Sequence, residues 1–347
     1  MHSFKKNIPA FSKLLSNIDA ASITADAYAQ QYLMLLLKHK IYYLNIYATV
    51  LDAAFAKTKE QIHKISMLDF GCGNGLLALF AKFSGVGFVA ASDMNVPFLL
   101  SAQQLSKQLD LPLDQWVIGN EDILPKAFQK QRIDIIVATD VIEHIYNLDK
   151  FFTIIKQLNN NMISVFTTAS IAENPIKSKQ LQSLQRKDEL SESNALHSNY
   201  HNDFVGLSFL DIRKKLIQQK FQQLDKDTID WLASATRGKQ ENDIYIAVDD
   251  FIRNKTLPIP IQHPTNTCDP ITGSWTERLL TINEYQELYY KYDFRLDIYY
   301  GYFNEFESGL KFWIAKMINQ LLFLLGKKAK LLSPFMVLVG KNKNANE

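Results

Sequence analysis

The first part of the chain alternates short apolar runs with amphipathic segments. Apolar positions at helical spacing separate five runs that we expect to be strands, at about residues 65–70, 87–93, 115–119, 133–139 and 162–168. Strands and helices that alternate with short connections are typical of a parallel sheet covered by helices on both faces. Before the first strand, apolar and aromatic positions between residues 24 and 57 recur every three or four residues, which predicts one or two amphipathic helices.

The alternation stops after the fifth strand. Residues 169 to about 205 are rich in Ser, Gln, Asn, Lys and Glu, a composition typical of loops, and a helix follows near residues 209–221. The prolines of residues 257–275 predict an irregular segment, because proline interrupts helices and restricts the residue before it. A helix from about Thr281 and two strands, near 295–303 and 334–340, complete the pattern.

These elements predict an α/β, Rossmann-like fold. We expect a mostly parallel seven-stranded sheet with N-terminal helices and a large insertion after strand five. The expected bounds are 1–60 for an N-terminal helical cap, 61–168 plus 281–342 for the sheet domain, and 169–280 for the insertion. An insertion of this length is too long for an ordinary loop and is expected to form a lid or subdomain.

Composition and charge narrow the class of protein. Of the 347 residues, 47% are hydrophobic, which excludes a disordered chain, and 38 Lys and Arg oppose 36 Asp and Glu. A formal net charge of +2 gives no electrostatic reason to expect nucleic acid as the partner. Two cysteines, Cys72 and Cys268, cannot make a disulfide framework. The first 20 residues lack an apolar stretch followed by a small-residue cleavage site, so we do not expect export. We therefore expect a cytoplasmic protein.

A glycine-rich turn follows the first predicted strand. It reads Asp69-Phe-Gly71-Cys72-Gly73-Asn-Gly75, and Asp93 ends the second strand. Glycines at this edge of a parallel sheet let the backbone approach a ligand, but Leu76 stands where a dinucleotide fingerprint needs its third glycine. The carboxylate of Asp69 would repel a pyrophosphate and attract an ammonium group, and Asp93 is placed to accept from ribose hydroxyls. The turn thus favours a ligand with a ribose, an ammonium group and no phosphate.

The segment Met67-Leu-Asp-Phe-Gly-Cys-Gly-Asn-Gly, with Asp93 after the next strand, resembles the nucleotide-binding half of class I S-adenosylmethionine-dependent methyltransferases. The resemblance covers residues 65–168 and extends to the last helix and two strands, residues 281–342. It implies S-adenosylmethionine as the cofactor, with the ribose held by Asp93 and the adenine face by Met94. The resemblance implies these further cofactor-binding residues: Asp69, Gly71, Cys72, Gly73 and Gly75 for the methionine part, one of Asn120, Glu121 and Asp122 for the adenine amino group, and Thr139 and Asp140 for the pocket wall.

The residues after strand four bear on the methyl acceptor. They lack the Asn/Asp-Pro-Pro-aromatic string of amino methyltransferases, and Asp140-Val-Ile-Glu143-His144 looks similar to the string in ubiquinone-pathway O-methyltransferases and small-RNA 2′-O-methyltransferases. We expect O-methylation of a small-molecule, sugar or lipid-linked acceptor, with His144 or His201 as the proton acceptor and Asp140 and Glu143 orienting the site. We assign no residues as metal ligands.

Three alternatives remain open at this stage. Asp140, Glu143 and His144, with His197 or His201, could bind a divalent cation if a helical turn places the first three on one face. The chain could bind the cofactor without turnover as an interaction module, or act as a Mg²⁺-dependent RNA 2′-O-methyltransferase. The polar segment 263–278 suits acceptor recognition or is an ordered turn.

Two further segments have competing interpretations. The tyrosines Tyr42, Tyr43 and Tyr47 could close over the cofactor, although such a stripe is more often core. Residues 309–325 are strongly apolar, too short for a transmembrane span, and followed by several lysines. We expect this helix to be buried against the sheet, with a peripheral membrane contact through 309–330 or a dimer contact as the alternatives. The oligomeric state is left open.

Overall fold

A computed structural model describes residues 3–191, 204, 206–259, 261, 263–306 and 308–343. The chain divides into two compact units. Unit 1 comprises Met1–Ile142, Leu148–Ala169 and Asn283–Glu347, and unit 2 comprises Glu143–Asn147 and Ser170–Ile282. The N-terminal helices belong to unit 1, and unit 2 includes the short segment that follows strand four.

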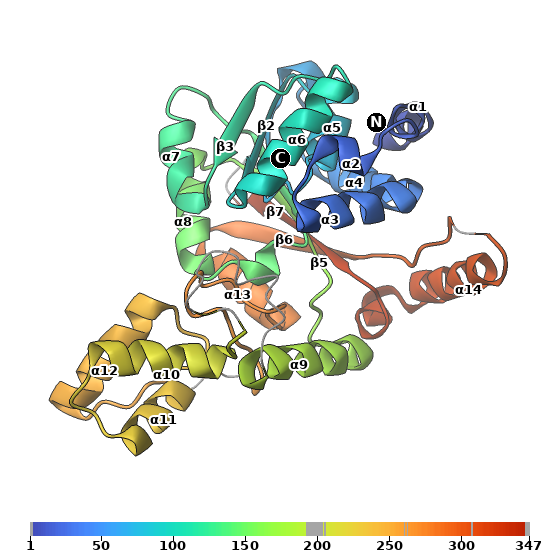
Figure 1. The fold of residues 1–347 in the computed structure, drawn as a ribbon. Helices are drawn as coiled ribbons and strands as arrows, with labels where there is room; N and C mark the ends of the chain where they lie inside the picture. Colours follow the sequence, from blue (N-terminus) through green and yellow to red (C-terminus); the bar gives the residue numbers. More distant parts are fainter. Residues whose placement is uncertain are drawn as a thin grey trace. The chain divides into compact units, whose positions relative to one another are not determined.

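Unit 1 is built on one seven-stranded sheet with the order β3-β2-β1-β4-β5-β7-β6 (Figure 1). The strands are β1 (Ser66–Phe70), β2 (Phe88–Asp93), β3 (Gln115–Ile118), β4 (Ile135–Thr139), β5 (Ile163–Thr168), β6 (Phe294–Tyr300) and β7 (Met336–Asn342). Strands β1 to β5 pair in parallel, and β7 is antiparallel to both β5 and β6. The predicted mostly parallel Rossmann-like sheet is confirmed, and all seven predicted strands are present.

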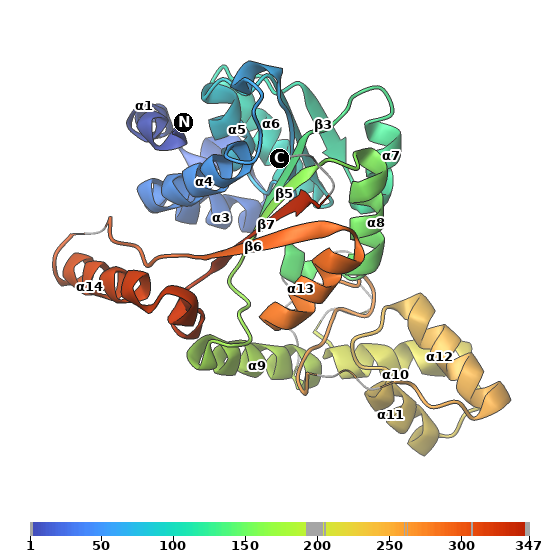
Figure 2. The same cartoon turned by 180° about the vertical axis from the view of Figure 1, so that it is seen from behind.

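Helices cover both faces of this sheet (Figures 1 and 2). One face carries an aromatic layer in which Phe151 packs on Phe70 and Phe166, while Phe152 packs on Tyr289 and Phe294. The helices of unit 1 after β1 are α5 (Leu76–Phe83), α6 (Val96–Gln108), α7 (Leu124–Ala127), α8 (Leu148–Leu158), α13 (Ile282–Lys291) and α14 (Leu310–Leu325). Rings that fill the layer on both α8 and α13 fix these helices against β1, β5 and β6, because buried aromatic pairs contribute both area and specific geometry.

The opposite face is packed by the N-terminal helices. They are α1 (Ile8–Leu15), α2 (Ala20–Ile23), α3 (Ala27–Lys38) and α4 (Lys40–Phe55). Phe11 is fully buried against Phe80 of α5, and the Asp26 carboxylate caps α3 by accepting from the Ala29 amide. The sequence predicted one or two helices between residues 24 and 57, and the structure has two, α3 and α4.

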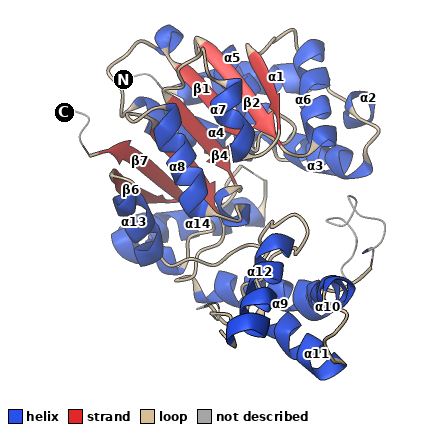
Figure 3. Ribbon diagram, turned by 90° about the vertical axis from the view of Figure 1, so that its left-hand side faces the viewer, coloured by secondary structure: helices blue, strands red, loops and turns tan. Residues whose placement is uncertain are grey.

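The described part of unit 2 contains four α-helices, which are labelled in Figure 3. They are α9 (Pro175–Leu190), α10 (Phe209–Lys220), α11 (Lys226–Ala235) and α12 (Glu241–Asn254). Helices α10, α11 and α12 share an apolar core that includes Ile217, Leu232 and Ile244. The helix predicted near residues 209–221 is therefore confirmed, and residues 257–275 are irregular among the positions described there.

The loop predicted from residue 169 is wrong over most of its described length, because α9 occupies Pro175–Leu190. The Asn174 side chain caps this helix by accepting from the amides of Ile176 and Lys177, and Pro175 begins its first turn. The face of α9 that packs inward presents the polar side chains Gln185 and Glu189. Hydrophobic periodicity could not reveal such a helix, since its buried positions are not apolar.

The prediction that residues 309–325 pack against the sheet is also wrong. The segment does form a helix, α14, but among its residues only Ala315 and Leu322 are buried. Most of its large apolar side chains are exposed. Within the described ranges, no helix has both the length and the apolar character needed to cross a membrane.

Candidate functional site

The glycine-rich turn lies between β1 and α5, at the carboxyl edge of the sheet. Gly71, Gly73 and Gly75 have φ angles of +69°, +52° and +76°, which L side chains rarely adopt. A Cβ at Gly71 would lie 2.6 Å from Val141 Cγ2, and one at Gly75 would lie 2.8 Å from the Ala102 Cβ. A Cβ at Gly73 would meet nothing closer than Tyr32, at 3.6 Å. The turn is closely packed at both ends, whereas a Cβ at Gly73 would make only ordinary van der Waals contacts.

Asp93 supports the middle of this turn. Its Oδ2 accepts from the Gly73 amide at 2.8 Å, and its Oδ1 accepts from the Asn95 amide at the same distance. Burial raises the pKa of Asp93, and these two amides act against that shift. A carboxylate offers about four acceptor positions, so both oxygens retain capacity for hydroxyl donors. Asp93 can therefore position the turn and accept from a ligand at once.

Asp69 lies beneath the turn and is only 1% exposed. Its Oδ2 accepts from the amide of Ala78 in the first turn of α5, at 3.0 Å. Burial raises the pKa of Asp69 to about 7, and the neighbouring Asp93 adds to the shift. A cation brought near this carboxyl would restore its charged form, which fits an ammonium ligand.

Two exposed apolar side chains neighbour Asp93, one next to it in the sequence and one on the adjacent strand. Met94 and Ile118 are 54% and 55% exposed, and Ile118 is paired with Asp93 across β2 and β3. Two apolar side chains beside a ribose-type acceptor offer a surface for a flat ring. Sequence reasoning identified Met94 and missed Ile118, although its place as the last apolar residue of β3 could have indicated it.

The three residues after β3 differ in their surroundings. Asn120 caps a short 3₁₀ turn by accepting from the Asp122 amide, and the Asp122 carboxylate is 2.6 Å from Lys150 Nζ. Glu121 is buried, and burial raises its pKa. Which of these three contacts a ligand stays a prediction.

Tyrosines of the N-terminal helices gather around Asp140 within unit 1. Burial raises the pKa values of Tyr32, Tyr43 and Tyr47, and the Asp140 carboxylate raises each of them further. These phenols therefore stay protonated near a carboxylate at the end of β4. Tyr47 is core, while Tyr32 is the side chain that a Cβ at Gly73 would contact first. Sequence reasoning missed Tyr32, which shares the helical spacing of the other tyrosines.

The segment after β4 does not form the helical turn that would put Asp140, Glu143 and His144 on one face. Asp140 has a φ of +54°, and the 3₁₀ turn η4 begins only at Ile142. Glu143 is buried and His144 is half-buried. No group of three or more His, Cys, Asp or Glu side chains suited to a metal occurs within the described parts of the chain. His197 and His201 lie outside the described residues.

His144 is held by the 275–278 segment inside unit 2. Its Nδ1 lies 2.7 Å from the Trp275 carbonyl oxygen, and that oxygen can only accept, so Nδ1 carries the proton. In the neutral ring the remaining nitrogen, Nε2, is then the proton acceptor. Glu277 Oε1 is 4.0 Å from Nε2, and Ser170 Oγ donates to the other Glu277 oxygen at 2.6 Å. Sequence reasoning named His144 but missed Glu277.

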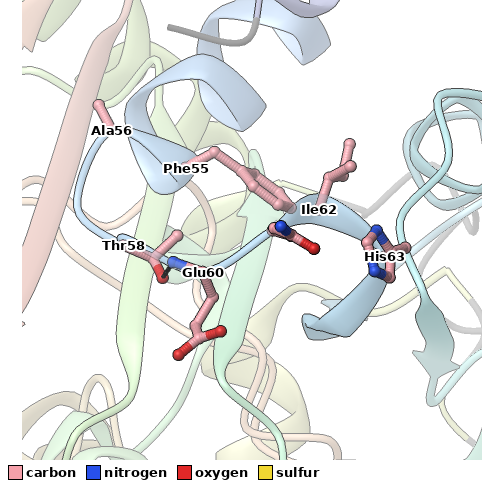
Figure 4. Close-up of a pocket in the computed structure, with 7 residues that line it drawn as sticks. Phe55, Ala56, Thr58, Glu60, Ile62 and His63 are labelled. Atoms are coloured by element: carbon pink, nitrogen blue, oxygen red, sulfur yellow. Dashed lines mark hydrogen bonds between the residues drawn. The ribbon is translucent and has the colours of Figure 1, made fainter.

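A surface hollow of unit 1 lies apart from this site (Figure 4). Its lining includes Phe55, Thr58, Glu60 and His63, all of which precede β1. The hollow is therefore at the amino end of β1, whereas the glycine-rich turn follows the carboxyl end. We do not include it in the candidate site.

A family model described as a methyltransferase domain matches residues 63–233. The matched range contains the glycine-rich turn, Asp93 and the segment after β4, on the sheet order described above. The chain carries a class I S-adenosylmethionine-dependent methyltransferase domain. S-adenosylmethionine is the cofactor of this family.

Curated relatives of the methyltransferase domain are distant. The ubiquinone biosynthesis O-methyltransferases of Rickettsia conorii and Rhodopseudomonas palustris are 26% and 32% identical over 120 residues, which cover 34% and 33% of this chain. The matches span only 39% and 45% of the length of those two relatives. The Rhizobium etli protein of the same name is 25% identical over 172 residues, covering 44% of this chain and 67% of that protein.

Solved structures are more distant still. A geranyl diphosphate C-methyltransferase from Streptomyces coelicolor A3(2) is 10% identical, with 98% of each chain covered and a TM-score of 0.42. The protein YcgJ from Bacillus subtilis is also 10% identical, with 86% of this chain and 99% of that chain covered and a TM-score of 0.44.

The residues of the methyltransferase domain fit the cofactor. Gly73 is only half-buried and puts no side chain on the middle of the turn, and Asp93 retains acceptor capacity beside the apolar Met94 and Ile118. The buried Asp69 carboxyl gains from a nearby cation. Asp69 thus suits the ammonium of an amino acid, Asp93 suits a ribose, and Met94 with Ile118 suits a purine ring.

Proposed function

We propose that this chain transfers a methyl group from S-adenosylmethionine to a hydroxyl oxygen of a small-molecule, sugar or lipid-linked acceptor. When bound, the cofactor supplies a methyl group on a positively charged sulfur. Two kinds of observation support the proposal. The carboxyl edge of the sheet fits the cofactor, and three distant relatives are named as O-methyltransferases that act in ubiquinone biosynthesis.

We propose the following cofactor contacts, which the family resemblance implies and which the hydrogen bonds and exposure around the turn support for Asp93 and Met94. Asp93 accepts from the ribose hydroxyls, and Met94 with Ile118 contacts the adenine ring. Asp69 and the backbone of Gly71, Cys72, Gly73 and Gly75 hold the methionine part. One of Asn120, Glu121 and Asp122 accepts from the adenine amino group, and Thr139 and Asp140 line the wall.

The observation that carries the acceptor assignment is the fixed tautomer of His144. Transfer to a hydroxyl requires a proton acceptor, and the Trp275 carbonyl leaves Nε2 of His144 as the basic nitrogen. Glu277 Oε1 lies 4.0 Å from this nitrogen. Glu143 and His201 remain proposed contributors to the same step.

We assign acceptor recognition to the insertion, residues 169–280, and within it to the segment that ends at Arg278. The segment 263–278 supplies the carbonyl and the carboxylate that hold His144. Arg278 also stacks on the Trp275 ring, with 4.5 Å from its guanidinium carbon to the ring centroid. A polar and aromatic segment of this kind suits a polar organic acceptor.

To test the proposal, the purified chain and methyl-labelled S-adenosylmethionine are incubated with host extract. The extract is first separated into four fractions, which contain small molecules, glycans with lipids, RNA, and protein. We expect label in the small-molecule or the glycan and lipid fraction, and its loss with Asp93→Ala. Label confined to RNA or protein would contradict the acceptor class. Cofactor binding with no label in any fraction would favour a non-catalytic module.

His144→Gln tests the proton acceptor once a labelled fraction is identified. A general base contributes about 100- to 10 000-fold, so kcat should fall in that range while cofactor affinity stays within twofold. His63→Gln is the matched control, because His63 is exposed at the opposite end of β1. Unchanged turnover in His144→Gln would show that another group takes the proton.

A further inference from the structure

Helix α14 presents an apolar stripe that the fold does not cover. Leu310, Trp313, Ile314, Met317, Leu321 and Leu324 are between 44% and 79% exposed. Their spacing of three and four residues places all six within about a third of the helix circumference. An exposed apolar stripe of this length on one helix is unusual for a surface that faces only water.

The opposite side of α14 holds the helix to the rest of unit 1. Asn319 accepts from the Phe303 amide at 2.7 Å and donates to the Phe303 carbonyl at 3.0 Å. Ala315 and Leu322, which lie on the same side as Asn319, are the buried residues of the helix. The helix is therefore anchored with its apolar stripe outward, and Figures 1 and 2 show it standing off the edge of the sheet.

Charge around the stripe indicates what covers it. Residues 309–332 contain five lysines and no Asp or Glu. Helical spacing puts Lys311 and Lys316 on the two borders of the stripe, and Lys327 and Lys328 follow the end of the helix, where both are exposed. Two copies packed through this face would bring like charges together, whereas an anionic surface would pair with them.

We infer that α14 lies in the interface of a membrane that carries anionic phospholipids. The apolar stripe enters the acyl boundary, and the lysines remain at the level of the phosphate groups. At 16 residues the helix is too short to span a bilayer, and Trp313 is suited to the interfacial zone. This inference is independent of the methyl acceptor, because it concerns where the protein binds and not what it modifies.

The test is sedimentation of the full chain with vesicles of equal parts phosphatidylglycerol and phosphatidylcholine, and with vesicles of phosphatidylcholine alone. We expect binding to the anionic vesicles, at least tenfold weaker binding to the neutral ones, and weakening by salt. The double variant Lys327→Gln, Lys328→Gln should bind the anionic vesicles about tenfold more weakly or worse, as should Trp313→Ser.

The matched control is Trp231→Ser, since Trp231 is also exposed but lies on α11. It should bind vesicles like the parent chain, and circular dichroism should show that every variant is folded. Equal affinity of the parent and Trp313→Ser would overturn the inference. The inference would also be overturned if the parent chain did not bind vesicles and was a dimer by analytical ultracentrifugation, and if Met317→Glu made it a monomer. A second copy of the chain would then cover the stripe.

Discussion

At the scale of single residues, the site depends on two carboxyl groups in unlike surroundings. Asp93 is braced by two backbone amides and keeps acceptor capacity, whereas Asp69 accepts from one amide in a nearly closed environment. The identities and spacing of both acids were predictable from the sequence. The degree of burial was not, because it depends on how α5 begins directly above Asp69.

The raised pKa of Asp69 predicts a pH dependence of stability. An unfolded Asp titrates near pH 4, so between about pH 4 and 7 the folded state binds more protons than the unfolded state. The free energy of unfolding should therefore fall as pH rises, by about 1.4 kcal/mol per pH unit from this group. Urea unfolding at pH 5, 6 and 7 should show this fall in the free energy of unfolding for the parent chain. The fall should be absent in Asp69→Asn. Parallel pH dependences in the two proteins would refute it.

The glycines of the turn should respond differently to alanine. Gly73→Ala should cost about 1–2 kcal/mol from its left-handed backbone, and it puts a methyl group on the middle of the turn, in ordinary contact with Tyr32. Gly75→Ala adds a 2.8 Å approach to the Ala102 Cβ to a similar backbone cost, so it should destabilise more. Urea unfolding gives the stability of each variant, and titration with S-adenosylmethionine should show at least tenfold weaker binding for Gly73→Ala. Unchanged binding in that variant would mean that the ligand does not approach Gly73.

At the scale of elements, the strands and the helices with an apolar face were predictable. Hydrophobic periodicity and the residues that end a helix or strand can both be recognised within a short stretch of sequence. Helix α9 was not, since its buried face is polar. Gln185 donates to the Asn266 side chain and the Glu277 carbonyl, and Glu189 pairs with the fully buried Arg213. The partners are separated from α9 by more than 20 residues, so no local pattern could reveal them.

The buried pair predicts that α9 is essential to the stability of unit 2. Arg213 also donates to the Ala233 carbonyl, and Thr267 donates to Glu189, so the pair links four segments: α9, α10, α11 and the irregular segment around Thr267. Glu189→Ala leaves the guanidinium uncompensated and should cost about 3–5 kcal/mol in the free energy of unfolding. Denaturant unfolding measures this loss, and Glu287→Ala, an exposed position of α13, should change it by less than about 0.5 kcal/mol. Equal effects would show that the pair is not a structural link.

At the scale of the whole molecule, the sequence indicated one sheet domain with an insertion, and the chain forms two compact units. The sequence did not indicate that Glu143–Asn147 belongs to the same unit as the insertion. This membership depends on backbone hydrogen bonds from Trp275 to His144 and from Arg278 to Glu143, across more than 130 residues. The candidate base His144 is consequently held by the insertion. This contact could not be predicted from the sequence, because its partners lie far apart along the chain.

The most direct test of the account is calorimetric titration of S-adenosylmethionine into the parent chain, Asp93→Asn and Asp114→Asn. Asp114 is the matched control because its carboxylate also accepts from a backbone amide, that of Val89, but at the amino end of β2. We predict one binding event in the parent chain, at least tenfold weaker binding in Asp93→Asn, and parent-like binding in Asp114→Asn. No binding by the folded parent chain, or equal affinities in the two variants, would contradict a cofactor site at the carboxyl edge of the sheet.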